Sequence, residues 1–172
     1  METLKLKSSD GDIFTVDTKV ACMSNLLSEM INCIEASNDD EVIPCDNINT
    51  PILKMVIDYC KHYTENPPSI LPLDYDNATS LNDISSWDYN FLQTEDKTML
   101  FDLVNAAHFL DIKSLEQVTC KMIANEIKGK TTEQIRQMFK IENDFTPAEE
   151  EELKRNTEWV KEKPFTCPDH PI

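Results

Sequence analysis

Polar and apolar residues alternate at the start of the chain in a pattern that predicts a β-hairpin. Leu4 and Leu6 alternate with polar neighbours, and Phe14 and Val16 resume the alternation further along the chain. Asp10-Gly11 stands between the two runs and is a two-residue turn signal. We therefore expect an opening hairpin with a tight turn.

The next segment changes to helical spacing. Apolar residues recur across positions 18–34 and predict one continuous apolar stripe. An acidic polar loop at 37–41 follows, and Val42-Ile43 is then a short strand candidate. Pro44 has no backbone N–H to donate, so this strand is expected at a sheet edge or at its own end. Thr50-Pro51 indicates an N-cap followed by proline at the first helical position.

A stretch rich in proline, aspartate and asparagine interrupts the helical pattern. Between about 66 and 86 it predicts a long mobile loop. Trp87 follows, and we expect it to be a core residue. One helix is then expected over 95–111, and a second carries apolar residues over 112–127. Lys128-Gly129 gives the second helix a basic end and a C-cap glycine.

Two short, highly charged helices are predicted beyond Gly129. Thr131-Thr132-Glu133-Gln134 and Thr146-Pro147-Ala148-Glu149 both have the form of a capping box, which starts a helix. Helices of this length are marginal in water without tertiary support. This extension nevertheless carries large apolar residues, which we expect to stay unburied until a partner covers them. They are Ile135, Met138, Phe139, Ile141, Phe145, Leu153, Trp159 and Val160.

Composition narrows the choice of partners and compartment. The 172 residues, 40% of them hydrophobic, are enough for one full core with a modest extension. The chain has 32 acidic and 16 basic residues, and its net charge of −16 would repel nucleic acids and anionic membranes. No secretion signal or membrane-spanning stretch is evident, so we expect a cytoplasmic and nuclear protein. Most of the six cysteines are expected to be reduced, buried, small hydrophobes.

The sequence offers little for catalysis or metal binding. With two glycines it contains no phosphate-binding glycine loop, and we expect no cofactor. The three histidines are scattered without a zinc-binding spacing, so no metal site is expected. The acidic run 149–152 is better explained as an exposed helix face than as a cation site. Cys167 and His170 superficially resemble a thiol nucleophile and its base, but they lie in a proline-rich tail that would not hold their geometry.

Several segments are more distinctive together than any single motif. They are Ser8-Ser9-Asp10-Gly11 with Ile13-Phe14, Ile52-Leu53-Lys54, Trp87-Asp88 with Phe91-Leu92, Ala106-Ala107 with Leu110-Asp111-Ile112-Lys113, Val118-Thr119-Cys120-Lys121, Ile127-Lys128-Gly129-Lys130-Thr131, and Asn143-Asp144-Phe145-Thr146. In this order, and with similarity reaching about residue 163, the chain resembles the Skp family of adaptors in SCF ubiquitin ligases. The resemblance implies an α+β fold, with a BTB/POZ-like core of hairpin, short strand and packed helices over 1–128. C-terminal helices over 129–163 would bind an F-box, and a tail over 164–172 lies beyond the usual end of the family.

By the same resemblance, the chain is a non-catalytic adaptor that joins an F-box protein to a cullin scaffold. The cullin-facing turn would be His108-Phe109, where the family carries Asn-Tyr, so hydrogen-bonding groups are lost there while aromatic bulk is kept. Pro147 is a candidate for the hydroxylation seen in some relatives, although starting a helix is a sufficient role for it. Whether the unbound chain forms a weak homodimer is left open. The residues that would contact the F-box are Met122, Ile123, Ile127, Ile135, Phe139, Ile141, Phe145, Leu153 and Trp159.

Three alternative functions are weighed against this interpretation. An elongin-C-like adaptor would keep the fold and use another cullin, but chains of that kind end sooner. A thiol-dependent enzyme would need Cys167 and His170. An acidic histone-type chaperone is suggested by net charge alone and would bind basic proteins in a salt-sensitive way.

Overall fold

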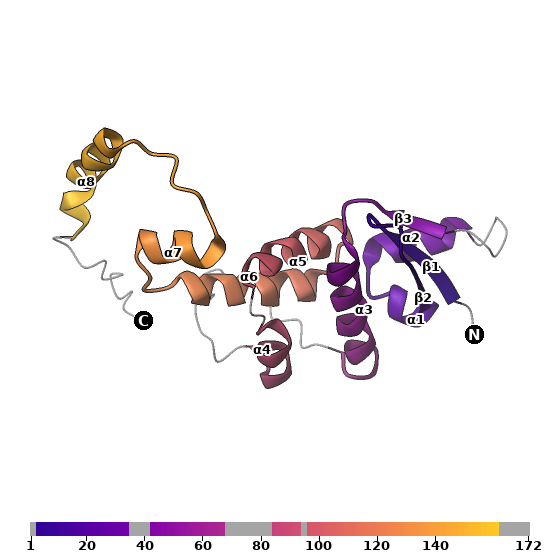
Figure 1. The fold of residues 1–172 in the computed structure, drawn as a ribbon. Coiled ribbons are helices and arrows are strands. Elements are labelled where there is room, and N and C mark those ends of the chain that lie inside the picture. Colours follow the sequence, from indigo (N-terminus) through magenta and orange to yellow (C-terminus); the bar gives the residue numbers. More distant parts are fainter. Residues whose placement is uncertain (1–2, 35–41, 68–83, 94–95, 162–172) are drawn as a thin grey trace.

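The computed structural model describes residues 3–34, 42–67, 84–93 and 96–161, apart from the side chains of 33–34 and 158–161. Figure 1 shows the sheet with α1 and α2 at one end, α3, α5 and α6 in the middle, and α7 and α8 at the other end. Over the described ranges, no helix combines the length and apolar character that crossing a membrane requires. The elements in order are β1 (Thr3–Ser8), β2 (Ile13–Asp17), α1 (Thr18–Ala21), α2 (Asn25–Ile34), β3 (Val42–Cys45), α3 (Thr50–Glu65), α4 (Ser86–Leu92), α5 (Thr98–Phe109), α6 (Lys113–Ile127), α7 (Thr132–Phe139) and α8 (Pro147–Lys161).

The three strands form one small mixed sheet in the order β2-β1-β3. β1 and β2 are antiparallel with Leu6 opposite Phe14, which confirms the predicted hairpin. β3 runs parallel to β1 at the edge, so Pro44 lies where a missing N–H is tolerated. The prediction of a two-residue turn is wrong, because the loop between the strands comprises residues 9–12. Ser8 N–H donates to the Asp12 carbonyl across this loop at 2.9 Å.

One hydrophobic core joins the inner face of the sheet to α3, α5 and α6. It runs from Leu4 in β1 to Met122 in α6, and Leu53, Leu103 and Leu115 are fully buried. These residues fall where the alternating and helical patterns place them. The architecture is therefore α+β, as expected, with a helical extension beyond the sheet and its packed helices.

An aromatic cluster anchors α4 against α3. Trp87 stacks on Phe91 and on His62, with ring centroids 4.8 and 3.7 Å apart. Tyr63 donates its hydroxyl hydrogen to Asp88 at 2.7 Å, and burial raises the pKa of Tyr63 to about 12. The prediction that Trp87 is a core residue is confirmed by its packing on the main cluster. Residues 68–83, most of the predicted mobile loop, lie outside the described part of the chain.

Two helix boundaries differ from the prediction. The stripe over 18–34 is divided into α1 and α2, because the Ser24 hydroxyl caps α2 by accepting a hydrogen bond from Leu27 N–H at 3.1 Å. The N-cap of α3 is Asn49, whose side chain accepts from Ile52 N–H at 3.0 Å, and Thr50 is already helical. Thr50 instead donates its N–H and its hydroxyl hydrogen to the hairpin loop.

Candidate functional site

α7 is joined to the core region by a turn and a capping box that the sequence predicted. Gly129 adopts φ +74° just beyond α6, a left-handed conformation that favours glycine. The Thr131 hydroxyl accepts from Gln134 N–H at 3.3 Å, and the Gln134 side chain accepts from Thr131 N–H at 2.9 Å. Both bonds of the box are present, so α7 begins where its local sequence requires.

The end of α7 docks on the start of α5. Phe139 is only 5% exposed and packs edge-on against Phe101, with ring centroids 4.7 Å apart. Lys140 follows α7 and donates from Nζ to the Asp96 carboxylate at 2.6 Å. The prediction that Phe139 stays unburied without a partner is therefore wrong, because a helix of the same chain covers it.

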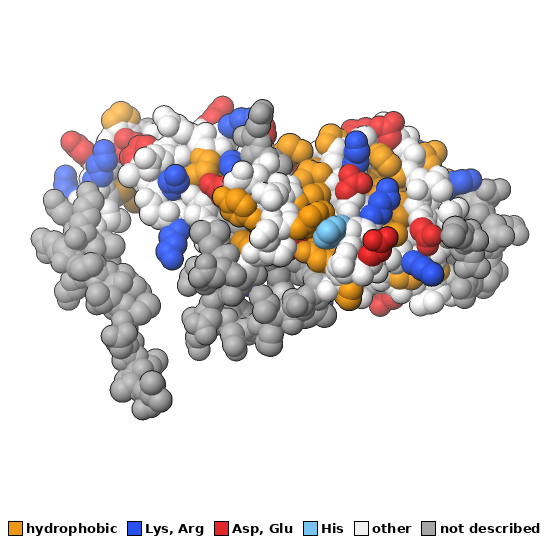
Figure 2. Space-filling view, turned by 90° about the horizontal axis from the view of Figure 1, so that it is seen from below, with side chains coloured by type: hydrophobic (Ala, Val, Ile, Leu, Met, Phe, Trp, Pro, Cys, Tyr) orange, Lys and Arg blue, Asp and Glu red, His pale blue; other side chains and the backbone are white. Residues whose placement is uncertain are grey.

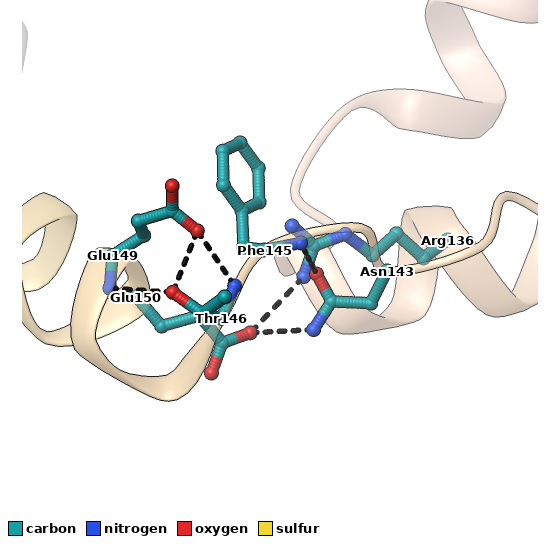
Figure 3. Close-up of polar contacts among 6 residues, drawn as sticks. All are labelled: Arg136, Asn143, Phe145, Thr146, Glu149 and Glu150. Atoms are coloured by element: carbon teal, nitrogen blue, oxygen red, sulfur yellow. Dashed lines mark hydrogen bonds and ion pairs between the residues drawn. The ribbon is translucent and has the colours of Figure 1, made fainter.

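A polar junction connects α7 to α8 (Figure 3). The Thr146 hydroxyl accepts from Glu149 N–H at 3.4 Å, and the Glu149 carboxylate accepts from Thr146 N–H at 2.8 Å, which confirms the second predicted capping box. Hydrogen bonds from Thr146 hold the pKa of Glu149 below its usual range. Glu150 turns back toward α7, where it accepts from Asn143 at 2.6 Å and pairs with Arg136 at 3.7 Å. The Arg136 guanidinium carbon lies 5.7 Å from the centre of the Phe145 ring, a cation–π arrangement.

The residues expected to contact an F-box fall into two groups by exposure. Ile127, Ile141, Phe145 and Leu153 are exposed large hydrophobic side chains, with Ile141 the most exposed at 52%. Met122 and Phe139 are buried, and Ile123 and Ile135 are half-buried. The side chain of Trp159 lies outside the described residues. The structure thus presents part of this set on its surface, and it does not test which of them a partner contacts.

Phe101 is a candidate contact that the sequence interpretation missed. It is 39% exposed and lies beside Phe139, so it extends the apolar surface from α7 onto α5. The signal was available, because Phe101 falls on the side of α5 opposite the stripe that carries Leu100 and Leu103. A single exposed aromatic residue is ordinary, and Phe101 is informative because it lies beside Phe139 at the edge of a larger apolar surface.

His108 and Phe109 lie at the far end of the same helix. Phe109 is 40% exposed, and His108 Nδ1 lies 3.1 Å from the Glu116 carboxylate on α6. Phe109 is eight residues beyond Phe101, the α5 residue that packs against α7, so about 12 Å of helix separates the two aromatic residues. Figure 2 shows hydrophobic side chains reaching the surface in the middle of the face seen from below. On α5, the candidate residues are thus Phe101 beside α7 and Phe109 about two turns further along the helix.

The described residues also bear on the candidate metal and thiol sites. Within the described ranges, no group of three or more His, Cys, Asp or Glu side chains is placed to hold a metal ion. Cys167 and His170, the residues of the thiol-enzyme alternative, lie outside those ranges, as does the tail 164–172. The prediction of buried cysteines holds for Cys45 and Cys60, whereas Cys22 and Cys120 are exposed.

Comparison with known proteins covers both parts of this arrangement. A family model described as the Skp1 family tetramerisation domain matches residues 2–65, and one described as the Skp1 family dimerisation domain matches residues 113–160. The E3 ubiquitin ligase complex SCF subunit sconC of Arthroderma otae is 44% identical over 93% of this chain and 95% of its own length. The chain belongs to the Skp1 family.

Other Skp1-family relatives cover the chain to a similar extent. The SCF ubiquitin ligase complex protein SKP1a of Dictyostelium discoideum is 44% identical over 95% of this chain and 98% of its own length. The SCF subunit sconC of Neosartorya fischeri is 46% identical over 94% of this chain and its full length. The second Skp1 model spans α6, α7 and most of α8, so the polar junction lies within a matched region.

Proposed function

We propose that this Skp1-family chain is the non-catalytic adaptor of an SCF ubiquitin ligase, bridging an F-box substrate receptor to a cullin. The observation that carries the proposal is the presence of two exposed aromatic positions about two turns apart on α5, Phe101 beside α7 and Phe109 at the last residue of the helix. An adaptor needs two surfaces that can be occupied at once, and a rigid helix keeps them apart. The relatives named as SCF subunits support the same function.

The surface at α7, α8 and the start of α5 is assigned to the F-box. Ile141, Phe145 and Leu153 are each more than two-fifths exposed, and Phe101 adds a fourth large side chain. Large apolar groups that lie exposed together mark protein interfaces. Stable complexes commonly bury about 2,000 Å² of surface in all, so these side chains would form the apolar centre of a larger interface.

The surface at the end of α5 is assigned to the cullin. Phe109 supplies an exposed aromatic ring, and Glu116 holds the His108 ring from α6.

Four described cysteines have free thiols, which fits a reducing compartment, so the proposal places the adaptor in the cytoplasm and nucleus.

Co-expression with several F-box segments tests the F-box assignment. The full chain should capture an F-box, and a chain ended at Gly129 should capture at least about tenfold less, because it lacks α7 and α8. Equal capture by both chains contradicts the site, and no capture by the full chain contradicts the function. Deleting residues 164–172 should leave capture intact, whereas a thiol enzyme built on Cys167 would lose its activity.

A matched pair of variants tests the cullin assignment. Phe109→Ala should weaken cullin binding by about tenfold or more and leave F-box capture unchanged. Tyr89→Ala is the control, since Tyr89 is an aromatic residue of nearly the same exposure on α4, 39% against 40%. Equal effects of the two changes on cullin binding would refute the assignment.

Salt separates the adaptor from an acidic chaperone. An F-box interface dominated by apolar burial should keep its affinity within about threefold between roughly 0.1 and 0.5 M salt. Binding of basic proteins by a chain of net charge −16 should fall much further over that range. A steep salt dependence of F-box capture would favour the chaperone.

A further inference from the structure

One carboxylate holds α8 in place relative to α7. Glu150 Oε1 accepts a hydrogen bond from Asn143 Nδ2 at 2.6 Å and lies 3.7 Å from Arg136 Nη1 (Figure 3). Arg136 belongs to α7, Asn143 to the connecting segment and Glu150 to the first turns of α8. All three parts of the junction therefore meet at a single oxygen atom.

Glu150 is also distinguished by its burial. Every described side chain from 140 to 157 is exposed except Glu150, which is partly buried. The side chains of Arg136 and Glu150 are 21% and 34% exposed. A partly buried pair is screened less by water and salt than a fully exposed pair. Glu150 is therefore the α8 residue whose contacts with Arg136 and Asn143 are best shielded from water.

Glu150 makes the described hydrogen bond and ion pair that join α8 to α7 and the connecting segment, beside the Arg136–Phe145 cation–π contact and the charge interaction between Lys154 and Glu133. The connecting segment is fixed at its start, where Ile141 N–H donates to the Arg136 carbonyl at 2.8 Å. At its other end, Thr146 and Glu149 cap α8 internally, and those bonds do not reach α7. Leu153 of α8 is 45% exposed, so its apolar side chain does not anchor the helix to the described part of the chain. Glu150 and Asn143 supply the link between the two fixed ends.

We propose that Glu150 is a positioning residue that sets the direction of α8 before an F-box docks. This inference rests on the proposed function, because it explains how that surface is prepared. A helix held in its binding direction loses less conformational freedom on association. If the contact is removed, α8 samples several directions, and only one of them binds the F-box. The apparent affinity for the F-box then falls in proportion to the fraction of molecules that hold the binding direction.

Two alanine variants of neighbouring glutamates make the test. In Glu150→Ala, the backbone residual dipolar couplings of α8 should no longer fit the alignment tensor determined for α5 to α7, because α8 no longer keeps one direction. F-box affinity should fall about three- to tenfold. Glu151→Ala is the matched control, because it changes the same residue type one position later on the exposed side of α8. It should leave both the couplings and the affinity at wild-type values.

A double variant tests whether the charge pair acts as one unit. Arg136→Gln with Glu150→Gln should bind an F-box no more weakly than the worse of its two single variants, because each change already breaks the same contact. Losses that multiply in the double variant would overturn the proposal. So would α8 couplings that still fit one tensor in Glu150→Ala, or an affinity that does not change when the couplings do.

The two proposals fail in different ways. If the wild-type chain captures no F-box, the proposed function fails, while the dipolar couplings still report whether Glu150 fixes α8. If the wild-type chain captures an F-box and Glu150→Ala behaves like Glu151→Ala in both measurements, the positioning role fails and the adaptor function stands.

Discussion

Lys140 and Asp96 show how one ion pair can give the fold a pH-dependent contact. Lys140 has a left-handed backbone, φ 55°, and its hydrogen bond is the main reason that the pKa of Asp96 falls from 3.8 to about 2, with Thr98 contributing. Because the folded pKa is lowered, the contact stabilises the fold above pH 3.8 and is lost as the pH falls toward 2.

We predict that Lys140→Met raises the pKa of Asp96 toward its ordinary value and flattens this acid dependence. The Thr98 hydrogen bonds remain, so the rise should be partial. The Asp96 carboxyl carbon followed by NMR titration measures the pKa, with Lys130→Met as an exposed control. A pKa that stays near 2 in Lys140→Met would show that Lys140 is not the main cause.

The cysteines divide by burial, and we predict that their reactivity divides in the same way. Burial raises the pKa of Cys45 to about 11 and that of Cys60 to about 12, so almost no thiolate forms near neutral pH. Burial and the Glu116 charge also raise the pKa of exposed Cys120. Among the four described cysteines, iodoacetamide labelling followed by peptide mass spectrometry should find that exposed Cys22 reacts faster than Cys120. Cys45 and Cys60 should react after unfolding, and their labelling in the native protein would contradict the burial.

At the scale of elements, local signals predicted what depends on nearby residues. The hairpin strands, α5, α6 and both capping boxes follow from spacing within a few positions, and the structure has them. The break between α1 and α2 was missed because Ser24 also donates its hydroxyl hydrogen to the Leu110 carbonyl, 86 residues later. A helical stripe cannot reveal a serine whose partner is the C-cap residue of a distant helix, α5.

We predict that Ser24→Ala destabilises the protein by about 1–3 kcal/mol, because it removes the cap of α2 and leaves the buried Leu110 carbonyl without this partner. Ser24 is 1% exposed, so water cannot readily replace the hydroxyl. Urea unfolding monitored by circular dichroism measures the change. Ser9→Ala, an exposed serine in the hairpin loop, should shift the free energy of unfolding by less than about 0.5 kcal/mol. If Ser24→Ala changed the free energy of unfolding as little as the control does, the hydrogen bonds of Ser24 would not stabilise the protein as predicted.

For the whole molecule, the sequence located the candidate surface but not its internal packing. The large apolar residues beyond Gly129 predicted that α7 and α8 form an interaction region, an inference that needs only local charge and spacing. Phe139 was wrongly expected to be unburied, since its cover is Phe101, 38 positions earlier on a helix whose docking no local pattern specifies. The Arg136–Glu150 contact was invisible for the same reason.

The position of Phe139 outside the main core cluster predicts that α7 can be released without unfolding the rest. The cluster ends at Met122, and Phe139 is buried separately against α5. Phe139→Ala should therefore weaken the docking of α7 by about 3 kcal/mol, the usual cost of removing a buried phenylalanine side chain. Hydrogen exchange should then become at least about tenfold faster for α7 amides and stay unchanged for β1 and α3 amides.

Met138→Ala is the matched control for this variant, because Met138 is its neighbour on α7 and is only half-buried. It should change exchange in α7 much less than Phe139→Ala does. F-box affinity should fall in Phe139→Ala as well, since the surface formed by α5 and α7 would separate. Faster exchange spread equally over β1, α3 and α7 would mean that Phe139 belongs to one cooperative core, and the chain would then not divide into a stable platform and a separately docked binding helix.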